Sequence, residues 1–453
     1  MRAFCLVTAT ALALAAAPAT ASAAQVVRVT SLGALRSAID KAVPGDEIRL
    51  ADGSYSAGSA ISVNRSGSAN APITITAEHV GKAEIKGSAG FSFSSSASNV
   101  VLRGFKLRHG GALSVPAGST HNRLTRLDVQ LTSGGNWVTL SGDDTEFDHN
   151  VLQNRTSQGV FLQVLGPSND MAKRVRVHHN YFSNHRFTGS NGGESIRFGL
   201  SSRQKYKAGG VVEDNLFEKA DGDSEAISVK SSDNVIRYNT IRDSRGFIVL
   251  RHGDRSVVEG NILLGKSGIR FHGNDHKIVG NYVHTTANRG IVFGSGNEAD
   301  SGPDSKLHDR PDRVVVAYNT VVGTTDGIHG DGGDFKPKDC VLANNILRGT
   351  GTLVSMPGGS DVKYEGNIAW GGAAGMPSGG YKAVDPKLVQ QDGLYRLSAG
   401  SPAVDAGVGS YPYAGTDFDL QTRSGKFDVG ADELLPGGTR KALTKADVGP
   451  LAP

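Results

Sequence analysis

The sequence predicts an all-β protein, a single-domain right-handed parallel β-helix with a short capping helix at its N-terminal end. Three observations indicate this fold. An Asn-containing motif recurs at spacings close to 22 residues, glycine is abundant with 60 residues, and no long helical periodicity follows residue 45. A coil of a solenoid buries its inward side chains only by stacking on the next coil, so a recurring motif of this length indicates such an array.

The repeated unit is a short apolar run, an asparagine turn and a second short apolar run. Its asparagines are Asn150, Asn180, Asn215, Asn239, Asn261, Asn281, Asn319, Asn345 and Asn367, with successive spacings of 30, 35, 24, 22, 20, 38, 26 and 22. Asparagine at such a corner tolerates left-handed backbone and can hydrogen-bond the coils above and below. The pattern of leucine-rich repeats is absent. The array is therefore predicted to be a β-helix with loops inserted into its longer coils.

The two ends of the chain differ from the repeats. Residues 1–24 read as a secretory signal peptide, which predicts a secreted or periplasmic protein. Within "SLGALRSAIDKAV" (31–43), the apolar side chains follow one helical stripe, which predicts a short helix over the first coil. Residues 25–435 form the predicted β-helix domain, and 436–453 read as a polar tail. The one cysteine after the signal, Cys340, excludes an internal disulfide and is predicted to be buried.

Charged residues gather on consecutive coils in the middle of the array. Asp223 and Glu225 are two residues apart, so on a strand they share one face. Lys230 and Arg251 are 21 residues apart, about one coil, which places them roughly 5 Å apart on neighbouring strands. Asn191 stands one coil earlier. Such oxygen ligands suit Ca²⁺, whereas no Cys/His pattern indicates zinc or iron. The alternative interpretation is a ladder of surface salt bridges.

Three sequence blocks carry a family resemblance: "NGGESIRFG" (191–199), "DSEAISVKSSDNVIRYNT" (223–240) and "LRHGDRSVVEGN" (250–261). They resemble polysaccharide lyase family 6, which includes alginate lyases and chondroitinase B, and "SPAVDAG" and "FDVGADE" resemble its C-terminal segment. The resemblance implies calcium ligands at Asn191, Asp223 and Glu225, a catalytic base at Lys230 and a catalytic acid at Arg251. Asp223 departs from the usual glutamate, which puts the metal in doubt.

The implied reaction is β-elimination on a uronate polymer, in which a base removes the C5 proton and the 4-O-linked sugar leaves. Bound Ca²⁺ would stabilise the charge that develops beside the uronate carboxylate. Lys230 must be neutral to act as a base. Basic side chains suit the uronate carboxylates, and the candidate sugar contacts are Arg197, His252, Arg270 and His272. Arg270 and His272 stand about one coil beyond Arg251.

The expected partner is an anionic polysaccharide, most of all alginate, with dermatan sulfate as the alternative. The net charge of +4 fits such a substrate. We expect a monomer that does not bind nucleic acid. A membrane is not expected as a partner either, because no later segment reaches the roughly 20 apolar residues of a membrane span. A β-helix glycoside hydrolase, using Asp223 and Glu225 as its two carboxylates, remains an alternative. So does a non-catalytic carbohydrate-binding protein.

Overall fold

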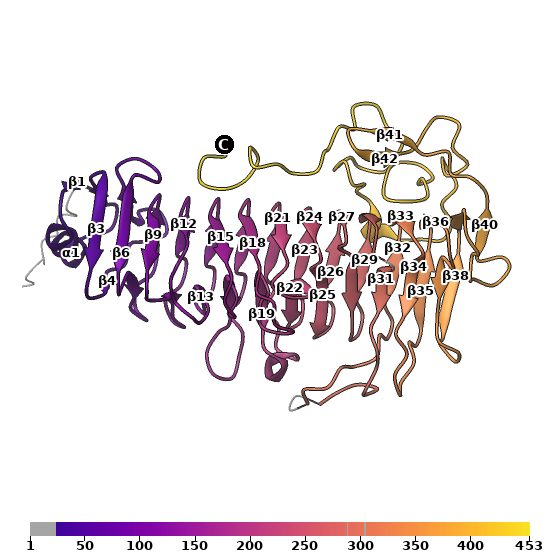
Figure 1. Cartoon of the computed structure of the whole chain (residues 1–453), viewed down its shortest axis with the longest axis horizontal. Helices are drawn as coiled ribbons and strands as arrows, with labels where there is room; N and C mark the ends of the chain where they lie inside the picture. The colour runs from indigo at the N-terminus through magenta and orange to yellow at the C-terminus, as the bar shows by residue number, and fades with distance from the viewer. Residues whose placement is uncertain (1–23, 288, 303–304) are drawn as a thin grey trace, which may run out of the picture.

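Three long parallel sheets wind around one axis and form a right-handed parallel β-helix, as the sequence predicts (Figure 1). The computed structural model describes residues 24–287, 289–302 and 305–453. Apart from Ala24, the predicted signal peptide lies outside the described residues. Each coil contributes one strand to each sheet in turn, so strands that neighbour one another in a sheet come from successive coils.

The first sheet runs the whole length of the solenoid. Its strands are β1 (Val26–Val29), β2 (Glu47–Leu50), β5 (Ile73–Ala77), β8 (Val100–Arg103), β11 (Arg123–Thr125), β14 (Glu146–Asp148), β17 (Arg176–His178), β20 (Val211–Glu213), β23 (Val235–Arg237), β26 (Val257–Glu259), β29 (Lys277–Val279), β32 (Val315–Ala317), β35 (Cys340–Ala343) and β38 (Val362–Glu365).

The second sheet follows the first across the asparagine corner. Its strands are β3 (Gly53–Ala57), β6 (Ala83–Gly87), β9 (Lys106–His109), β12 (Asp128–Val129), β15 (Val151–Arg155), β18 (Tyr181–His185), β21 (Leu216–Ala220), β24 (Thr240–Ser244), β27 (Ile262–Gly265), β30 (Tyr282–Thr285), β33 (Thr320–Thr324), β36 (Ile346–Gly349), β39 (Asn367–Trp370) and β40 (Tyr381–Ala383).

The third sheet closes each coil, and longer loops lead from it back to the first sheet. Its strands are β4 (Ile61–Val63), β7 (Phe91–Phe93), β10 (Leu113–Val115), β13 (Val138–Leu140), β16 (Leu162–Val164), β19 (Ile196–Gly199), β22 (Glu225–Lys230), β25 (Phe247–His252), β28 (Ile269–Phe271), β31 (Arg289–Phe293), β34 (Asp326–Gly330) and β37 (Val354–Ser355).

Like side chains stack inside the solenoid from coil to coil. Ile227 pairs with Ile248, which pairs with Ile269, and the row continues through Ile291 to Ile328. All five side chains are fully buried. Such a row packs at high density because each β-branched side chain meets an identical neighbour one strand away.

The predicted asparagines form one continuous buried ladder between the first and second sheets. Each side-chain amide donates to the Oδ1 of the next ladder asparagine at 2.9 to 3.0 Å, from Asn150 through to Asn367. The expectation of left-handed backbone at the asparagine itself is wrong. The preceding residue takes that conformation instead, as at His179 with φ 53° and Tyr238 with φ 58°. The asparagine is left with its side chain aimed along the axis.

The N-terminal helix forms where the sequence predicts it. Helix α1 (Leu32–Lys41) begins after Ser31, whose Oγ accepts a hydrogen bond from the Ala34 amide at 3.2 Å. Leu35 and Ile39 are buried against the first coil. None of the helices in the described residues is both long and apolar enough to cross a membrane.

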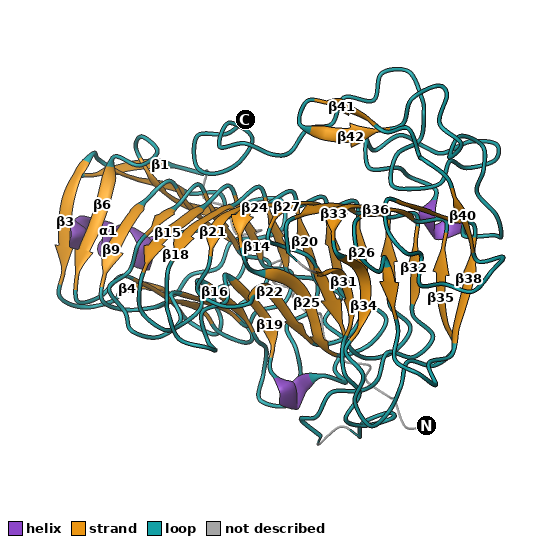
Figure 2. Cartoon of the chain, turned by 45° about the vertical axis from the view of Figure 1, so that its right-hand side comes forward, coloured by secondary structure: helices purple, strands orange, loops and turns teal. Residues whose placement is uncertain are grey.

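The C-terminal segment folds back along the solenoid after the last coil. It carries a small antiparallel pair, β41 (Val389–Gln391) and β42 (Leu394–Arg396), and a short 3-10 helix, η2 (Pro412–Ala414) (Figure 2). The predicted polar tail is tied to the coils, because the Arg440 guanidinium donates to carbonyls of Gly260 and Tyr238 at 2.7 and 3.0 Å. Further on, the Gly449 amide donates to the His179 carbonyl.

The ladder predicts a large stability effect from a single buried amide. Replacing Asn239 by Ala removes the Oδ1 that accepts from the main-chain and side-chain amides of Asn215, and the side-chain amide that donates to Asn261 Oδ1. Because each buried polar group left unpaired costs about 1–3 kcal/mol, we expect Asn239→Ala to lower the free energy of unfolding by about 2–4 kcal/mol, measured by urea unfolding. The matched change Asn70→Ala, at an exposed turn, should cost less than about 0.5 kcal/mol. Equal effects of the two changes would contradict the ladder's role.

Candidate active site

The predicted catalytic residues lie on the outer face of the third sheet, on β22 and β25. These two strands pair with two register shifts, one near each end. Glu225 pairs with Phe247 but Ile227 pairs with Ile248, and Val229 pairs with Leu250 but Lys230 pairs with His252. Arg251 is therefore the extra residue of a bulge. A bulge turns the side chain of its extra residue away from the regular alternation, which is common next to functional sites.

The Lys230 side chain is largely enclosed, with 11 % of its surface exposed. Its Nζ lies 3.7 Å from Glu194 Oε1. Burial lowers the pKa of the Lys230 ammonium, with Arg197 and Arg251 adding to the effect, whereas Glu194 and Glu225 oppose it. The balance favours the neutral amine more than in an exposed lysine, which is what a base requires.

Arg251 and Glu225 form an ion pair across β22 and β25, with Nη1 on Oε1. Glu225 is buried, and its other oxygen, Oε2, has no hydrogen-bond partner. The arginine side chain is about one third exposed. The pair thus joins a buried carboxylate to a guanidinium that still reaches solvent.

Asp223 lies on the loop just before β22 and faces the loop of the preceding coil. Its Oδ2 accepts hydrogen bonds from the Gly192 amide at 2.8 Å and the Gly193 amide at 3.4 Å. The two loops touch because Gly193 lacks a side chain. A Cβ there would collide with the Gly222 carbonyl oxygen. Asn191, the remaining predicted ligand, is exposed on the same loop.

Glu194 is a site residue that the sequence interpretation missed. Its side chain is 1 % exposed, and its Oε2 is buried without a hydrogen-bond partner. Burial raises the pKa of this carboxyl, and Arg197 and Lys230 counteract the rise. The available signal was its position, because Glu194 stands inside the "NGGESIRFG" block, three residues after Asn191.

These carboxylates suit a cation. The unpartnered buried oxygens of Glu194 and Glu225 are groups that a hard, oxygen-binding cation would satisfy. Two carboxylates of this surface already have partners, since Asp223 accepts from backbone amides and Glu225 pairs with Arg251. The donor set therefore fits Ca²⁺ in chemical type.

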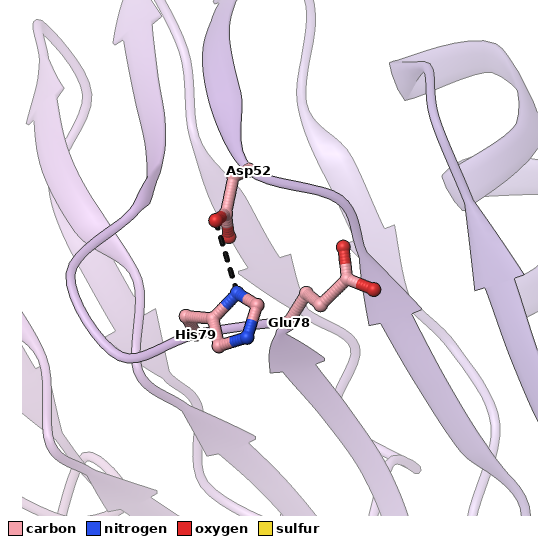
Figure 3. A group of neighbouring side chains, drawn as sticks. All are labelled: Asp52, Glu78 and His79. Atoms are coloured by element: carbon pink, nitrogen blue, oxygen red, sulfur yellow. Dashed lines mark hydrogen bonds and ion pairs between the residues drawn. The ribbon is translucent and has the colours of Figure 1, made fainter.

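More compact groups of candidate ligands lie elsewhere in the described part of the chain. In each group, the candidate ligand atoms lie within 4.8 Å of one another. The groups are Asp52, Glu78 and His79; Glu146, Asp148 and His178; and Asp417, Asp419 and Asp432. In the first, the His79 ring bonds Asp52 while the Glu78 carboxylate points away (Figure 3). An arginine engages one carboxylate of every group, through the pairs Arg28–Glu78, Arg123–Asp148 and Arg396–Asp419. Their charge is thus already balanced in part.

The two predicted histidines gather beyond Arg251 around a third, His308, that the sequence interpretation missed. The His308 ring centre lies 4.9 Å from that of His252 and 4.2 Å from that of His272. Burial lowers the pKa of His252 to about 3 and that of His308 to about 4, with nearby cations adding to both shifts. The three imidazoles are therefore neutral near pH 7. No repeat or spacing marks His308, because it stands in a loop.

Arg270 lies on a different row from the one the sequence spacing indicates. It pairs with Val249 rather than with Arg251, so it continues the row that runs through Arg197, Ser228 and Val249. It lines a pocket of about 210 Å³ together with Ser224, Glu225, Arg245, Phe247, Val249, Arg289 and Val292. Arg245 and Arg289 were not predicted from the sequence. Three arginines thus surround an apolar floor beside Glu225.

Arg197 lies on β19, which pairs with β22 on the side opposite to β25. Its Nε donates to Gln163 Oε1 at 2.5 Å, and its Nη1 lies 3.7 Å from Glu194 Oε1. The structure therefore brings Arg197, Lys230, Glu225 and Arg251 onto one charged surface, with Glu194 between the first two.

Comparison with known proteins places this surface in a family. A sequence model of the family described as Chondroitinase B matches residues 29–355, most of the solenoid. The chain belongs to polysaccharide lyase family 6. A comparison with curated proteins found no match.

Solved structures of this family share the fold. One described as the family 6 alginate lyase AlyGC has a TM-score of 0.72 and 25 % identity, over 83 % of this chain and 55 % of that chain. This chain thus spans about half of that lyase. A mannuronic-acid-specific family 6 lyase from human gut microbiota has a TM-score of 0.69 and 24 % identity, over 80 % of this chain and 91 % of that one. A family 6 lyase from Pseudopedobacter saltans has a TM-score of 0.68 and 20 % identity, over 94 % and 99 %.

The contact between Glu194 and Lys230 predicts a measurable change in the lysine. The Glu194 carboxylate stabilises the ammonium, so Glu194→Gln should lower the pKa of Lys230 further. Acetylation of Lys230, followed by mass spectrometry across a pH series, should then begin at lower pH than in the unchanged protein. Glu213→Gln, on the first sheet, is the control and should leave this profile in place. A profile that stays or moves to higher pH in Glu194→Gln would contradict the contact.

Proposed function

We propose that this protein is a polysaccharide lyase that cleaves alginate by β-elimination. The observation that carries the proposal is the enclosed Lys230, whose pKa is lowered beside an arginine and a set of buried carboxylates. A hydrolase has no use for a neutral lysine at this position, whereas removal of a proton next to a uronate carboxylate needs a base of this kind.

The reaction follows from the placement of Lys230 and Arg251. Lys230 Nζ takes the C5 proton of a uronate, the electron pair forms a C4–C5 double bond, and the C4–O bond breaks. A guanidinium is a poor proton donor, so we assign Arg251 to electrostatic support of the departing oxygen while water supplies the proton. Because the base must be neutral, activity should rise with pH through the pKa of Lys230 and level off above it.

We assign Asn191, Asp223 and Glu225, with Glu194 beside them, as the residues that would hold Ca²⁺. Bound there, the ion would neutralise the uronate carboxylate and so make the C5 proton more acidic. Asp223 is one methylene shorter than the glutamate usual in the family. Glu194 Oε2, which is buried without a hydrogen-bond partner, would offer a further carboxylate ligand on the same face.

Alginate is the substrate we favour, and dermatan sulfate is the second candidate. The family 6 structures that resemble this chain include alginate lyases, and one of them is described as mannuronic-acid-specific. The matching family model, described as Chondroitinase B, is the observation that supports dermatan sulfate. Arg197, Arg270, Arg245 and Arg289 would bind uronate carboxylates on either polymer, and His252 and His272 would contact the sugars. The predicted signal peptide fits an exported enzyme.

The product separates elimination from hydrolysis. We expect incubation with alginate, polymannuronate or polyguluronate to release products with a new ultraviolet absorbance, that of the conjugated unsaturated uronate. Lys230→Ala should lose on the order of 10²-fold or more in kcat, because it lacks the general base. Lys86→Ala, an exposed lysine on the second sheet, is the matched control and should keep full activity.

Other outcomes distinguish the alternatives. New reducing ends without the chromophore would show hydrolysis and overturn the lyase proposal. The chromophore with dermatan sulfate alone would favour the second candidate. Arg251→Lys should also be severely impaired, since an ammonium cannot reproduce the guanidinium's planar contacts.

Calcium binding can be measured apart from activity. We expect calorimetric titration of chelator-treated protein with Ca²⁺ to show one site, which Asp223→Asn and Glu225→Gln weaken at least about tenfold, because each removes an anionic ligand. Mg²⁺ should bind poorly, since it requires a tighter octahedral shell. Chelation should abolish activity and Ca²⁺ should restore it. Full activity after exhaustive chelation would reject the metal and leave the arginines to neutralise the uronate.

A further inference from the structure

A second ionic cluster lies next to the catalytic surface, at the corner where the third sheet leads back to the first. Lys205 Nζ lies 3.4 Å from Asp254 Oδ2, 3.1 Å from Asp300 Oδ1 and 3.0 Å from Asp309 Oδ2. We call these four residues the Lys205 cluster. Burial disfavours charge on Lys205, but the three carboxylates outweigh it and raise the pKa of its ammonium, so it stays charged.

The Lys205 cluster joins three segments that are far apart in the sequence. Lys205 follows the short 3-10 helix η1 (Ser201–Arg203), Asp254 lies in the turn after β25, and Asp300 and Asp309 lie between β31 and β32. The neighbouring Gln204 is buried, and its Nε2 donates to the Ser305 carbonyl at 2.7 Å. Gln204 and Lys205 thus both hold the segment between β31 and β32 against this corner.

Each carboxylate of the cluster stands next to a histidine of the active-site surface or on the same segment. Asp254 follows His252 by two residues, and Asp309 directly follows His308. We call His252, His272 and His308 the histidine cluster, since their rings are in contact. The His272 ring is held separately, with Nδ1 3.1 Å from the Ser295 carbonyl oxygen. A shift of Asp309 or Asp254 would therefore move His308 relative to His252.

The histidine cluster lies next to the proposed catalytic residues. Lys230 pairs with His252 across β22 and β25, and His252 directly follows Arg251 in the chain. The Nδ1 of His252 is buried without a hydrogen-bond partner. Neutral imidazoles can both donate and accept hydrogen bonds, and sugar hydroxyl groups can do the same.

From this arrangement we propose that Lys205 is a positioning residue. It holds His308 against the buried rings of His252 and His272, so that the partly exposed His308 ring binds the sugar hydroxyls next to Lys230 and Arg251. The inference rests on the proposed function, because it assumes a polysaccharide on this face. The Lys205 ammonium contacts both Asp254 and Asp309, which are buried, so its removal would take a shared cation away from two buried carboxylates. Removal of the Lys205 charge should displace His308 and weaken substrate binding more than turnover.

The test compares variants of the full-length protein with alginate as the substrate. Lys205→Ala should raise KM about tenfold with a smaller loss in kcat, as expected for a group that acts through binding. Lys205→Arg keeps the charge and should retain most of the activity. Lys207→Ala, an exposed lysine on the same loop, is the control and should behave like the unchanged protein. If Lys205→Ala does not fold, Lys205→Met keeps the apolar stem and takes its place.

A double-mutant cycle then decides whether Lys205 acts through His308. Adding Lys205→Ala to His308→Ala should cause no further loss in kcat/KM, because both changes remove the same interaction. Losses that add in full, or a normal KM in Lys205→Ala, would overturn the proposal.

A readout without substrate separates this inference from the proposed function. In NMR spectra of the histidine rings, His308 should titrate nearer to its ordinary pKa in Lys205→Met than in the unchanged protein, since the ring becomes exposed. An identical titration would overturn the positioning role. Absence of any unsaturated product from the unchanged protein would instead defeat the proposed function, and the NMR comparison would still decide the role of Lys205.

Discussion

The whole structure depends on coils that stack in register, and the buried asparagine ladder fixes that register. Each ladder amide bonds the next one along the axis at 2.9 to 3.0 Å, so the corner between the first and second sheets has the same geometry in the coils from Asn150 to Asn367. The preceding residue takes the left-handed conformation that turns the chain. Because all amides of the ladder are buried, a coil that lost this register would leave several polar groups unpaired at once. The rows of stacked isoleucines inside the third sheet follow from the same register.

The ladder constrains the corner between the first and second sheets, whereas the corner between the third sheet and the first accepts insertions of different lengths. The coil from Asn281 to Asn319 is 38 residues long, and the coil from Asn261 to Asn281 only 20, yet both keep the same amide contact. Much of the extra length is inserted between the third sheet and the first. Two long insertions, which carry Lys205 and His308, leave the solenoid at this corner several coils apart. The coils between them carry only short connections at this corner, so nothing there separates the two insertions, and ionic contacts join them.

Two lysines on the same side of the molecule show how surroundings set charge. Lys230 is enclosed, has one carboxylate at 3.7 Å and has two arginines nearby, so the pKa of its ammonium falls. Lys205 has three carboxylates within 3.4 Å, and the pKa of its ammonium rises although burial opposes it. The first lysine is prepared to take a proton and the second to keep one. Burial acts on both lysines in the same sense, and only at Lys205 do the neighbouring carboxylates outweigh it.

The sequence by itself determined the solenoid, the asparagine ladder, the helix α1 and the strands that carry Lys230, Arg251 and Glu225, whereas Asp223 lies on a loop and not on the strand that the sequence predicts. Stacking relates residues about one coil apart, so a spacing of 21 or 22 is enough to place two side chains on neighbouring strands. Only the tertiary structure decided the contacts that have no such period. The bulge that pairs Lys230 with His252, the enclosure of Glu194, and Arg245 and Arg289 around the pocket belong to this group. So does the approach of His308 to His252, since it depends on packing between segments more than 50 residues apart, which leaves no repeat in the sequence.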